Sequence, residues 1–377
     1  MKKVAFLVLH LGYGGVERAV ISEANLLCDC CDVEIICFYK LYDKPAFDIN
    51  PKIKITYLTE NLVPNRAELK SAIQNKNIAS LFREGFKSIK ILYLRSALMK
   101  KAIKNLDADI IISSRYLYHK LLTNNAKKGT VLIAQEHNHH NGDKKYIKKQ
   151  INAVRNMDYF MPVSRELTDF YKDRVVGKVK CHYIPHHLEY IPKSLSQLTE
   201  KNIISVGRLS PEKGMDDLIR VFALVYKKHP DWKLHIAGDG ECHSEIEELI
   251  KQLGLEQNVI LHGFKNREEL NRMLSTSSVY VMASHTESFG LVLIEAQSFG
   301  LPCVAFDSAR GACEILSNNK NGFLINNRSL SDMANAIDKL ITDFDYRTKL
   351  GKAGRQNAEK YFLPNVKEQW IKLINNI

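Results

Sequence analysis

The feature that most constrains the fold is a regular alternation of short β-rich apolar runs with stretches of helical periodicity. Eleven of these runs are expected to be strands: VAFLVLH (4–10), VEIICF (33–38), IKITYL (53–58), DIIISS (109–114), VLIAQE (131–136), YFMPVS (159–164), IISVG (203–207), KLHIAG (233–238), NVILHG (258–263), VYVMAS (279–284) and PCVAF (302–306). Continuous apolar strands that alternate with helices predict parallel sheets covered by helices on both faces. The fold class is therefore α/β.

The strands form two series, separated by the segment YIPHHLEYIPKSLSQLTEKN (183–202). This segment has two prolines and no clear periodicity, so it is expected to be a linker. The 377 residues are enough for two domains, which we place at 1–190 and 191–360. Ligands of such sheets bind beyond the carboxyl ends of the strands. Two such domains facing each other would form a cleft at those ends.

The charge is unevenly distributed along the chain. Residues 1–190 contain 31 Lys and Arg against 19 Asp and Glu, whereas residues 191–377 contain 23 of each kind, so the first half carries the whole excess of +12. Such asymmetry indicates an anionic partner for the first half. No nucleic-acid-binding module is recognisable, so nucleic acid is not the expected partner.

Ten of these cations lie in residues 66–105, where only Glu68 and Glu84 oppose them and apolar residues are interleaved. A basic amphipathic segment of this kind suits an anionic membrane surface. The alternative is a solvated cationic face with a core stripe.

The remaining composition favours an intracellular protein. The start, MKKVAFLVLHLGYGG, superficially resembles a signal peptide, but it continues into a glycine loop and is expected to be the first strand. No apolar run approaches the roughly 18 residues that a membrane span needs. Cys28, Cys30 and Cys31 cluster without a complete set of metal ligands, so reduced thiols are expected. We therefore expect a cytoplasmic location, peripheral at the inner face of the cell membrane.

Three segments that follow predicted strands combine into one candidate site. In HLGYGGVERAV (10–20), glycines precede a helix over 16–27, a pattern that brings backbone close to an anion. In SVGRLSPEKGMDDLI (205–219), Arg208 and Lys213 flank a tight loop and are able to converge on a diphosphate.

The third segment, HTESFGLVLIEAQSFGLP (285–302), has two carboxylates eight positions apart, Glu287 and Glu295. The N–H groups of residues 289–292 at a helix start suit phosphate, whereas carboxylates suit hydroxyl groups. A nucleotide sugar would use all of these features together. The alternative is that Glu287 is a helix cap and Glu295 a surface residue.

A fourth segment, IAQEHNHHNGD (133–143), contains His137, His139 and His140. A loop of histidines without a cysteine or carboxylate companion gives weak support for a metal site. We expect one histidine to face the cleft as a polar contact to sugar or phosphate, and the other two to lie on the loop surface.

These motifs resemble those of the retaining glycosyltransferases of family 4, which have the GT-B fold. The resemblance rests on GRLSPEKG, AGDG (237–240), HGF (262–264) and the E-x7-E of ESFGLVLIEAQSFGLPCVA, and GGVER resembles the corresponding loop of the bacterial polysaccharide branch. It runs in order from about residue 4 to residue 370. One departure is His186-His187, which stands where many members have Asn-Gly.

The resemblance implies an acceptor-binding first domain, a nucleotide-sugar-binding second domain, and a C-terminal helix over 361–377 that packs back on the first domain. The implied catalytic residues are His137, near the sugar, Glu287, on the sugar hydroxyls, and Arg208 and Lys213, on the diphosphate. Further donor contacts are implied for Glu295 at the ribose, Gly263 and Phe264 by the base, the backbone amides of Phe289, Gly290, Leu291 and Val292, and Gly14 and Gly15 at the phosphates. No metal and no cofactor besides the nucleotide sugar are implied.

The predicted reaction is transfer of a hexose or N-acetylhexosamine from a nucleotide sugar, UDP being expected, to an acceptor hydroxyl with retention. The expected acceptor is a lipid-linked glycan or oligosaccharide in surface polysaccharide assembly. Three alternatives remain open: a transferase with a small soluble acceptor, a nucleotide-sugar 2-epimerase, and a non-catalytic sugar-nucleotide-binding partner.

Overall fold

The computed structural model describes residues 1–377 and divides into two compact units. Unit 1 comprises residues 1–184 and 367–377, and unit 2 comprises residues 185–366. These boundaries differ slightly from the expected 190/191 and 360/361. The reason is local pairing, because the Leu188 N–H donates to the Tyr361 carbonyl at 2.8 Å and Leu188 forms a bridge with Phe362. Residues 185–190 therefore pack with unit 2.

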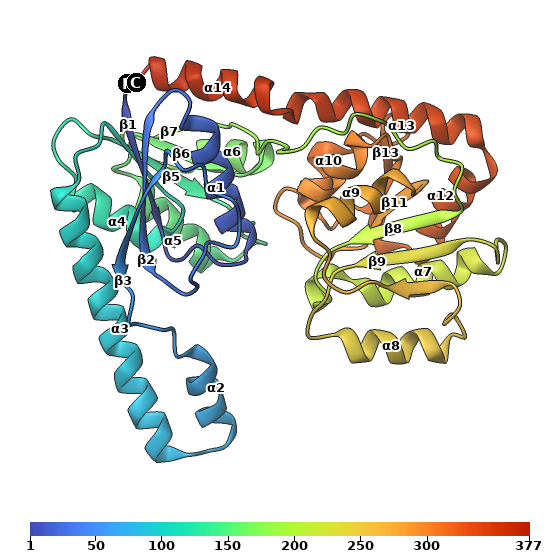
Figure 1. Cartoon of the computed structure of the whole chain (residues 1–377), viewed down its shortest axis with the longest axis horizontal. Coiled ribbons are helices and arrows are strands. Elements are labelled where there is room, and N and C mark those ends of the chain that lie inside the picture. The colour runs from blue at the N-terminus through green and yellow to red at the C-terminus, as the bar shows by residue number, and fades with distance from the viewer. The chain divides into compact units, whose positions relative to one another are not determined.

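Unit 1 is built on a parallel seven-stranded sheet of order β3-β2-β1-β4-β5-β6-β7. Its strands are β1 Lys3–Val8, β2 Asp32–Tyr39, β3 Lys54–Thr59, β4 Ile110–Ser113, β5 Val131–Glu136, β6 Tyr159–Pro162 and β7 Lys180–Cys181. Its helices are α1 Gly15–Leu27, α2 Arg66–Gln74, α3 Ile78–Asn105, α4 Tyr116–Asn125, α5 Lys144–Val154 and α6 Arg165–Lys172. Helix α1 lies on one face of the sheet, and α3 and α4 lie on the other (Figure 1).

Unit 2 contains a parallel six-stranded sheet of order β10-β9-β8-β11-β12-β13. Its strands are β8 Asn202–Val206, β9 Lys233–Ala237, β10 Val259–Leu261, β11 Val279–Met282, β12 Cys303–Phe306 and β13 Gly322–Ile325. Its helices are α7 Met215–Tyr226, α8 His243–Gln252, α9 Arg267–Ser275, α10 Leu291–Ser298, α11 Arg310–Ile315, α12 Leu330–Thr342 and α13 Phe344–Ala358. Helices α7 and α8 cover one face, and α9 and α10 cover the other (Figure 1).

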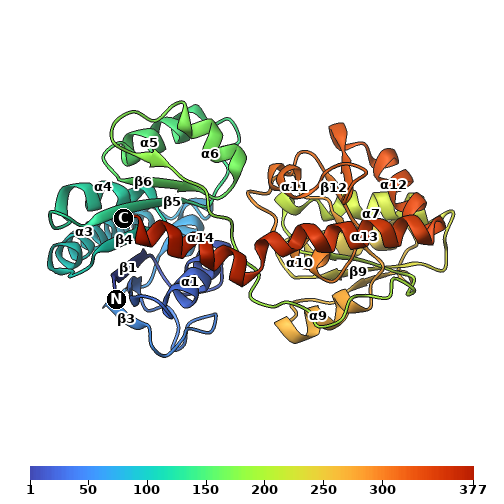
Figure 2. The same cartoon turned by 90° about the horizontal axis from the view of Figure 1, so that it is seen from above.

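The last helix, α14 (Leu363–Asn375), begins in unit 2, and its residues from Lys367 onward belong to unit 1. Lys367 forms an ion pair with Asp29 at 2.6 Å, Trp370 is buried, and the Lys2 ammonium donates to the Ile374 carbonyl at 2.8 Å. Both ends of the chain therefore lie on unit 1 (Figure 2).

All eleven predicted strands are present, as β1 to β6 and β8 to β12. Apart from the half-buried strands β3 and β10, their central residues are almost entirely buried, which is why continuous apolar runs predicted them. Two strands were missed. Strand β7 has only two residues, and β13 is a four-residue run, Gly-Phe-Leu-Ile, that follows an asparagine-rich turn. Strand β7 is too short to show a period, and the apolar run of β13 is only the three residues Phe-Leu-Ile between a glycine and an asparagine.

Candidate active site

The sheet of unit 2 has a topological switch point, where the order of the strands reverses between β8 and β11. The loops that follow these strands, 207–214 and 283–290, start side by side at their carboxyl ends, which is where open α/β sheets bind ligands. The His285 N–H donates to the Glu212 carbonyl at 2.8 Å and ties the two loops together. Gly214 has a φ of +60°, and a Cβ there would collide with the Ala283 carbonyl oxygen, so only glycine permits this approach.

Lys213 and Glu287, which are 74 positions apart in sequence, meet at this point. The Lys213 ammonium lies 2.6 Å from Glu287 Oε2, and about a fifth of each side chain is exposed. The structure thus brings together two of the residues that the sequence assigned to one site. Because both side chains are only partly exposed, their attraction is screened less than that of a surface ion pair.

Arg208 lies on the same loop but is more exposed. Its guanidinium is 3.0 Å from Glu212 Oε1, and 75% of its side chain is accessible to solvent. The guanidinium is therefore accessible to an anion, and its present partner is the partly exposed carboxylate of Glu212. Each predicted cation of this loop thus has its own carboxylate partner.

Helix α10 begins next to Glu287 with its first N–H groups uncapped by any side chain. Gly290 precedes the helix with a φ of +93°, a left-handed conformation that favours glycine. The side chain of Phe289 is buried, and its ring centroid lies 5.2 Å from that of His186, edge to face. The unusual His186 therefore packs directly against the predicted donor loop. The amides of Phe289 to Val292 lie in this turn, where a helix N-terminus favours an anion.

Glu295 lies inside α10 and is only 5% exposed, so the alternative interpretation of it as a surface residue is wrong. Its Oε1 accepts from Arg267 Nη1 at 2.7 Å. Arg267 is the first residue of α9, three positions after Phe264, whose side chain is 73% exposed, and Gly263 has a φ of +64°. The Arg267–Glu295 ion pair therefore connects two parts of the predicted nucleoside site. Arg267 begins the helix that follows the turn predicted to contact the base, and Glu295 is the carboxylate predicted to bind the ribose.

Two arginines of this region, Arg267 and Arg328, were not among the residues predicted from sequence. Arg328 donates to the carbonyl oxygens of Ala283 and Ser284, both at 3.0 Å, and it pairs with Asp217 in the first turn of α7. It therefore holds the start of the 283–290 loop against the helix that follows the 207–214 loop. No local pattern marks these arginines, because their partners lie 20 to 111 positions away.

In unit 1 the predicted glycine loop leads into α1, as expected, with Gly14 at its N-cap and no side-chain cap. The buried Glu17 carboxylate occupies the first turn and accepts from Arg115 Nη2 at 2.9 Å, with His10 Nε2 at 3.7 Å. A Cβ at Gly14 would collide with this carboxylate, whereas Gly15 is open. Burial, aided by the charge of Arg115, lowers the pKa of His10.

His137 follows β5 directly and is half-buried. The expectation that His139 and His140 lie on the loop surface is wrong, because both pack on α6: His139 Nε2 is 3.3 Å from Glu166, and the His140 ring centroid is 4.2 Å from that of Phe170. The chain contains no group of three His, Cys, Asp or Glu side chains that would hold a metal ion.

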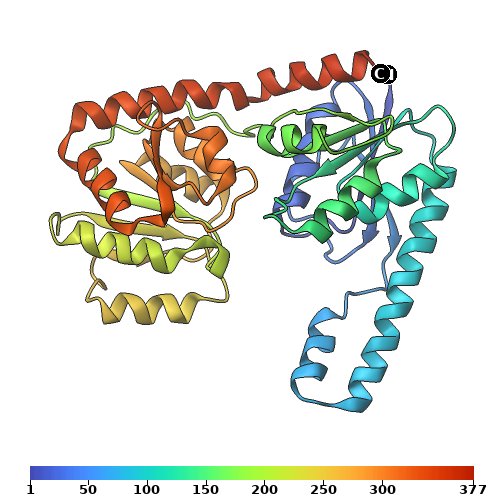
Figure 3. The same ribbon diagram turned by 180° about the vertical axis from the view of Figure 1, so that it is seen from behind.

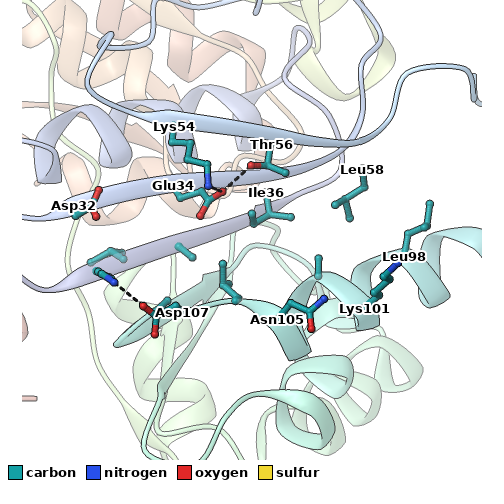
Figure 4. A pocket seen from close by; sticks show the side chains of 16 residues that line it. Asp32, Glu34, Ile36, Lys54, Thr56, Leu58, Leu98, Lys101, Asn105 and Asp107 are labelled. Atoms are coloured by element: carbon teal, nitrogen blue, oxygen red, sulfur yellow. Dashed lines mark hydrogen bonds and ion pairs between the residues drawn. The ribbon is translucent and has the colours of Figure 1, made fainter.

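A separate hollow of about 580 Å³ lies in unit 1 between the β1-β2-β3 part of the sheet and the end of α3 (Figure 4). It includes Lys3, which pairs with Asp107 at 2.5 Å, and Glu34, which accepts from Thr56 Oγ1 at 2.6 Å. Several lining residues begin their strands, so the hollow is near the amino ends of β1 to β3 and away from the carboxyl ends where ligands of such sheets bind.

Comparison with known proteins identifies the class. Residues 188–357, which make up most of unit 2, match the family model described as "Glycosyl transferases group 1". The fold is that of the two-domain GT-B enzymes: TarM of Staphylococcus aureus superposes over 100% of both chains with a TM-score of 0.77, at 19% sequence identity. The chain is therefore a glycosyltransferase with the GT-B fold and a group 1 glycosyltransferase domain.

Two curated relatives match almost the whole chain. An uncharacterized glycosyltransferase of Haemophilus influenzae is 29% identical, over 98% of this chain and 99% of the relative. A Campylobacter jejuni enzyme is 26% identical, over 100% of this chain and 99% of the relative. That enzyme is an α-1,4-N-acetyl-D-galactosaminyltransferase, and its name gives an undecaprenol-diphosphate-linked glycan as its acceptor.

Proposed function

We propose that this protein is a retaining glycosyltransferase of family 4. It transfers a hexose or N-acetylhexosamine from a nucleotide sugar, most simply a UDP-sugar, to a hydroxyl group of a lipid-linked glycan in surface polysaccharide assembly. The observation that carries the proposal is the Lys213–Glu287 pair at the switch point, beside the uncapped start of α10. This arrangement offers a cation and backbone amides to a diphosphate and a carboxylate to sugar hydroxyls.

In this proposal the charge that develops on the leaving diphosphate is stabilised by Lys213, Arg208 and the amides at the start of α10. Arg208 exchanges Glu212 for a phosphate oxygen when the donor binds, which its exposure allows. Glu287 holds the hydroxyls of the transferred sugar, and His137 of unit 1 contacts the same sugar. The leaving phosphate assists deprotonation of the acceptor hydroxyl on the same face of the sugar, so no enzymic nucleophile is needed.

The nucleoside lies further along α10. Glu295, fixed by Arg267, accepts from the ribose hydroxyls, and the exposed Phe264 ring offers a flat apolar surface to the base. The glycine loop at Gly14 and Gly15 approaches the phosphates from unit 1. The proposed reaction requires neither a metal ion nor a cofactor.

The acceptor is proposed to be lipid-linked for two reasons. The charge excess lies in unit 1, which has 33 Lys and Arg against 19 Asp and Glu, a net charge of +14. The Campylobacter jejuni relative acts on a polyprenol-linked glycan. Unit 1 would thus lie at an anionic membrane surface, where such acceptors are found. No helix of the chain combines the length and apolar character needed to cross a bilayer.

The test is to incubate the purified protein with a panel of nucleotide sugars, with and without lipid-linked acceptors, and to measure the released nucleotide and the anomeric configuration of the product. We expect acceptor-dependent nucleotide release and an α-product from an α-donor, both abolished by Glu287→Ala. An inverted product contradicts the retaining mechanism. Release of a C2-epimer without any acceptor would instead identify a 2-epimerase, and turnover confined to small soluble sugars would identify a different acceptor class.

A further inference from the structure

Helices α2 and α3 form a hairpin that extends away from the sheet of unit 1 (Figures 1 and 3). Helix α3 has 28 residues, which corresponds to a length of about 42 Å at 1.5 Å per residue. Only Glu84, Ile91, Met99 and Ile103 of its side chains are buried, so most of this long helix is covered by neither α2 nor the sheet.

Five of the exposed residues of α3 are large apolar residues that lie in one stripe. Their spacings are 4, 4, 3 and 4, and each is between 66% and 76% exposed: Ile78, Phe82, Phe86, Ile89 and Tyr93. This spacing places them on one face of a helix. Contiguous exposed apolar surface of this kind is uncommon and marks an interaction site.

The buried side of the same helix is polar where it meets the start of α2. Asn65 Nδ2 donates to Glu84 Oε2 at 2.9 Å and to the Glu84 carbonyl at 2.8 Å, and Ser88 Oγ donates to Asn65 Oδ1 at 2.9 Å. This part of the hairpin therefore has polar residues inside and apolar residues outside, the reverse of a helix that packs on a protein core. The hydrogen-bonded cluster fixes the orientation in which the stripe faces outward.

The charges beside the stripe indicate what covers it. Arg83, Lys87 and Lys90, with spacings of 4 and 3, lie along one flank of the apolar face, and all three are exposed. A second copy of this chain would bring the same cations to the same surface, and the +14 charge of unit 1 adds to that repulsion. An anionic lipid bilayer matches both components, because its headgroups attract the cations and its acyl chains accept the aromatic side chains.

We propose that the apolar stripe of α3 inserts into the interfacial region of an anionic phospholipid bilayer, with Arg83, Lys87 and Lys90 at the level of the headgroups. The hairpin is then the element that attaches the enzyme to the membrane. That this attachment brings unit 1 to its lipid-linked acceptor rests on the proposed function, but the insertion itself does not.

Insertion predicts a component of binding that salt does not remove. Electrostatic attraction to the surface weakens as the Debye length falls from about 10 Å at 0.1 M to about 3 Å at 1 M salt, whereas the burial of aromatic rings does not. Burial of one large apolar side chain is worth about 1.5–3 kcal/mol, and 1.4 kcal/mol corresponds to a factor of ten. The double variant Phe82→Ser/Phe86→Ser should therefore bind vesicles at least about 100-fold more weakly.

The experiment uses the full chain and vesicles of phosphatidylglycerol or phosphatidylcholine, sedimented at 0.1 M and 1 M salt. The wild-type protein should bind phosphatidylglycerol and retain part of that binding at 1 M salt. Phe82→Ser/Phe86→Ser should lose the retained part, and Val176→Ser, which changes an exposed apolar residue elsewhere in unit 1, should not. The emission of a Phe86→Trp variant should shift to the blue on phosphatidylglycerol and be quenched by brominated acyl chains.

Three outcomes would overturn the proposal: complete release by salt, unchanged binding of the serine variant, or no emission shift at position 86. Stripe-dependent dimers in the absence of lipid would identify a second copy as the occupant instead. Failure of the proposed function is distinguishable from failure of insertion, because vesicle binding needs no substrate. Conversely, turnover of the serine variant on a detergent-solubilised acceptor should equal that of the wild type.

Discussion

Glu136 offers a stability prediction whose magnitude follows from its surroundings. It is the last residue of β5, only 4% exposed, and its carboxylate accepts from the Gln150 side chain and, at 2.8 Å, from the Asn138 N–H. Burial raises the pKa of this carboxyl from 4.5 to about 7. The folded state therefore binds a proton more tightly than the unfolded state does.

The sign of the pH dependence follows from that difference. Below pH 4.5 Glu136 is protonated in both the folded and the unfolded state, so this residue does not make the free energy of unfolding depend on pH. As the pH rises from 4.5 through 7, the folded state retains a proton that the unfolded state has released, and stability is lost. A shift of this size corresponds to about 3 kcal/mol in total, at about 1.4 kcal/mol per pH unit. Glu136→Gln does not titrate and should escape this loss.

The assay is urea denaturation of the full chain between pH 4.5 and pH 8. Trp232 lies in unit 2 and Trp370 in unit 1, so Trp370 fluorescence in a Trp232→Phe background reports on unit 1 alone. The stability of Glu136→Gln relative to the parent should increase by about 3 kcal/mol across this range. Glu60→Gln, at an exposed position of the same unit, should show no such increase. Parallel pH profiles for Glu136→Gln and the parent would refute the reasoning.

The remaining predictions concern the proposed donor site. Arg208→Ala/Lys213→Ala should weaken UDP binding by a few kcal/mol in calorimetry, since hydrogen bonds to charged groups contribute about 1.5–3 kcal/mol each; unchanged affinity would contradict the assignment. Glu287→Ala should lower turnover much more than UDP affinity, because UDP lacks the transferred sugar. Glu295→Ala should instead weaken the binding of UDP itself through the ribose. The opposite pattern would mean that the roles of the two glutamates are exchanged. Activity should survive an excess of EDTA in a nucleotide-release assay, and its loss would direct attention to the histidines at 137–140.

The layout of the sheets was predictable because buried parallel strands consist of unbroken apolar residues, and all eleven of the predicted runs are strands. The meeting of Lys213 and Glu287 was predictable for a related reason. Both follow strands of one parallel sheet, and the carboxyl ends of such strands share an edge. Arg267 and Arg328 were missed because each pairs with residues distant in sequence, and nothing near either arginine specifies its partner.

Helix α3 shows a different limit of sequence reasoning. Its alternation of apolar and basic residues fitted either a membrane surface or a solvated face with a core stripe. Periodicity identifies the faces of a helix but not the one that is covered. Here the contacts of Glu84 with Asn65 bury the polar side, and Phe82 and Phe86 remain exposed. The difference lies in tertiary packing, which no local pattern contains.

On the proposed function, the pairing of a cation with a carboxylate favours the intact donor over simpler anions. Inorganic phosphate would have to compete with Glu287 for Lys213, which lie 2.6 Å apart. A nucleotide sugar brings phosphate oxygens to Lys213 and hydroxyl donors to Glu287, so it engages both groups without separating them. Arg328 strengthens this preference, because by holding the carbonyls of Ala283 and Ser284 it limits how far the Glu287 loop moves away from Lys213. Selectivity for the sugar-bearing nucleotide would then arise in the ligand-free arrangement of the two loops, before any acceptor binds.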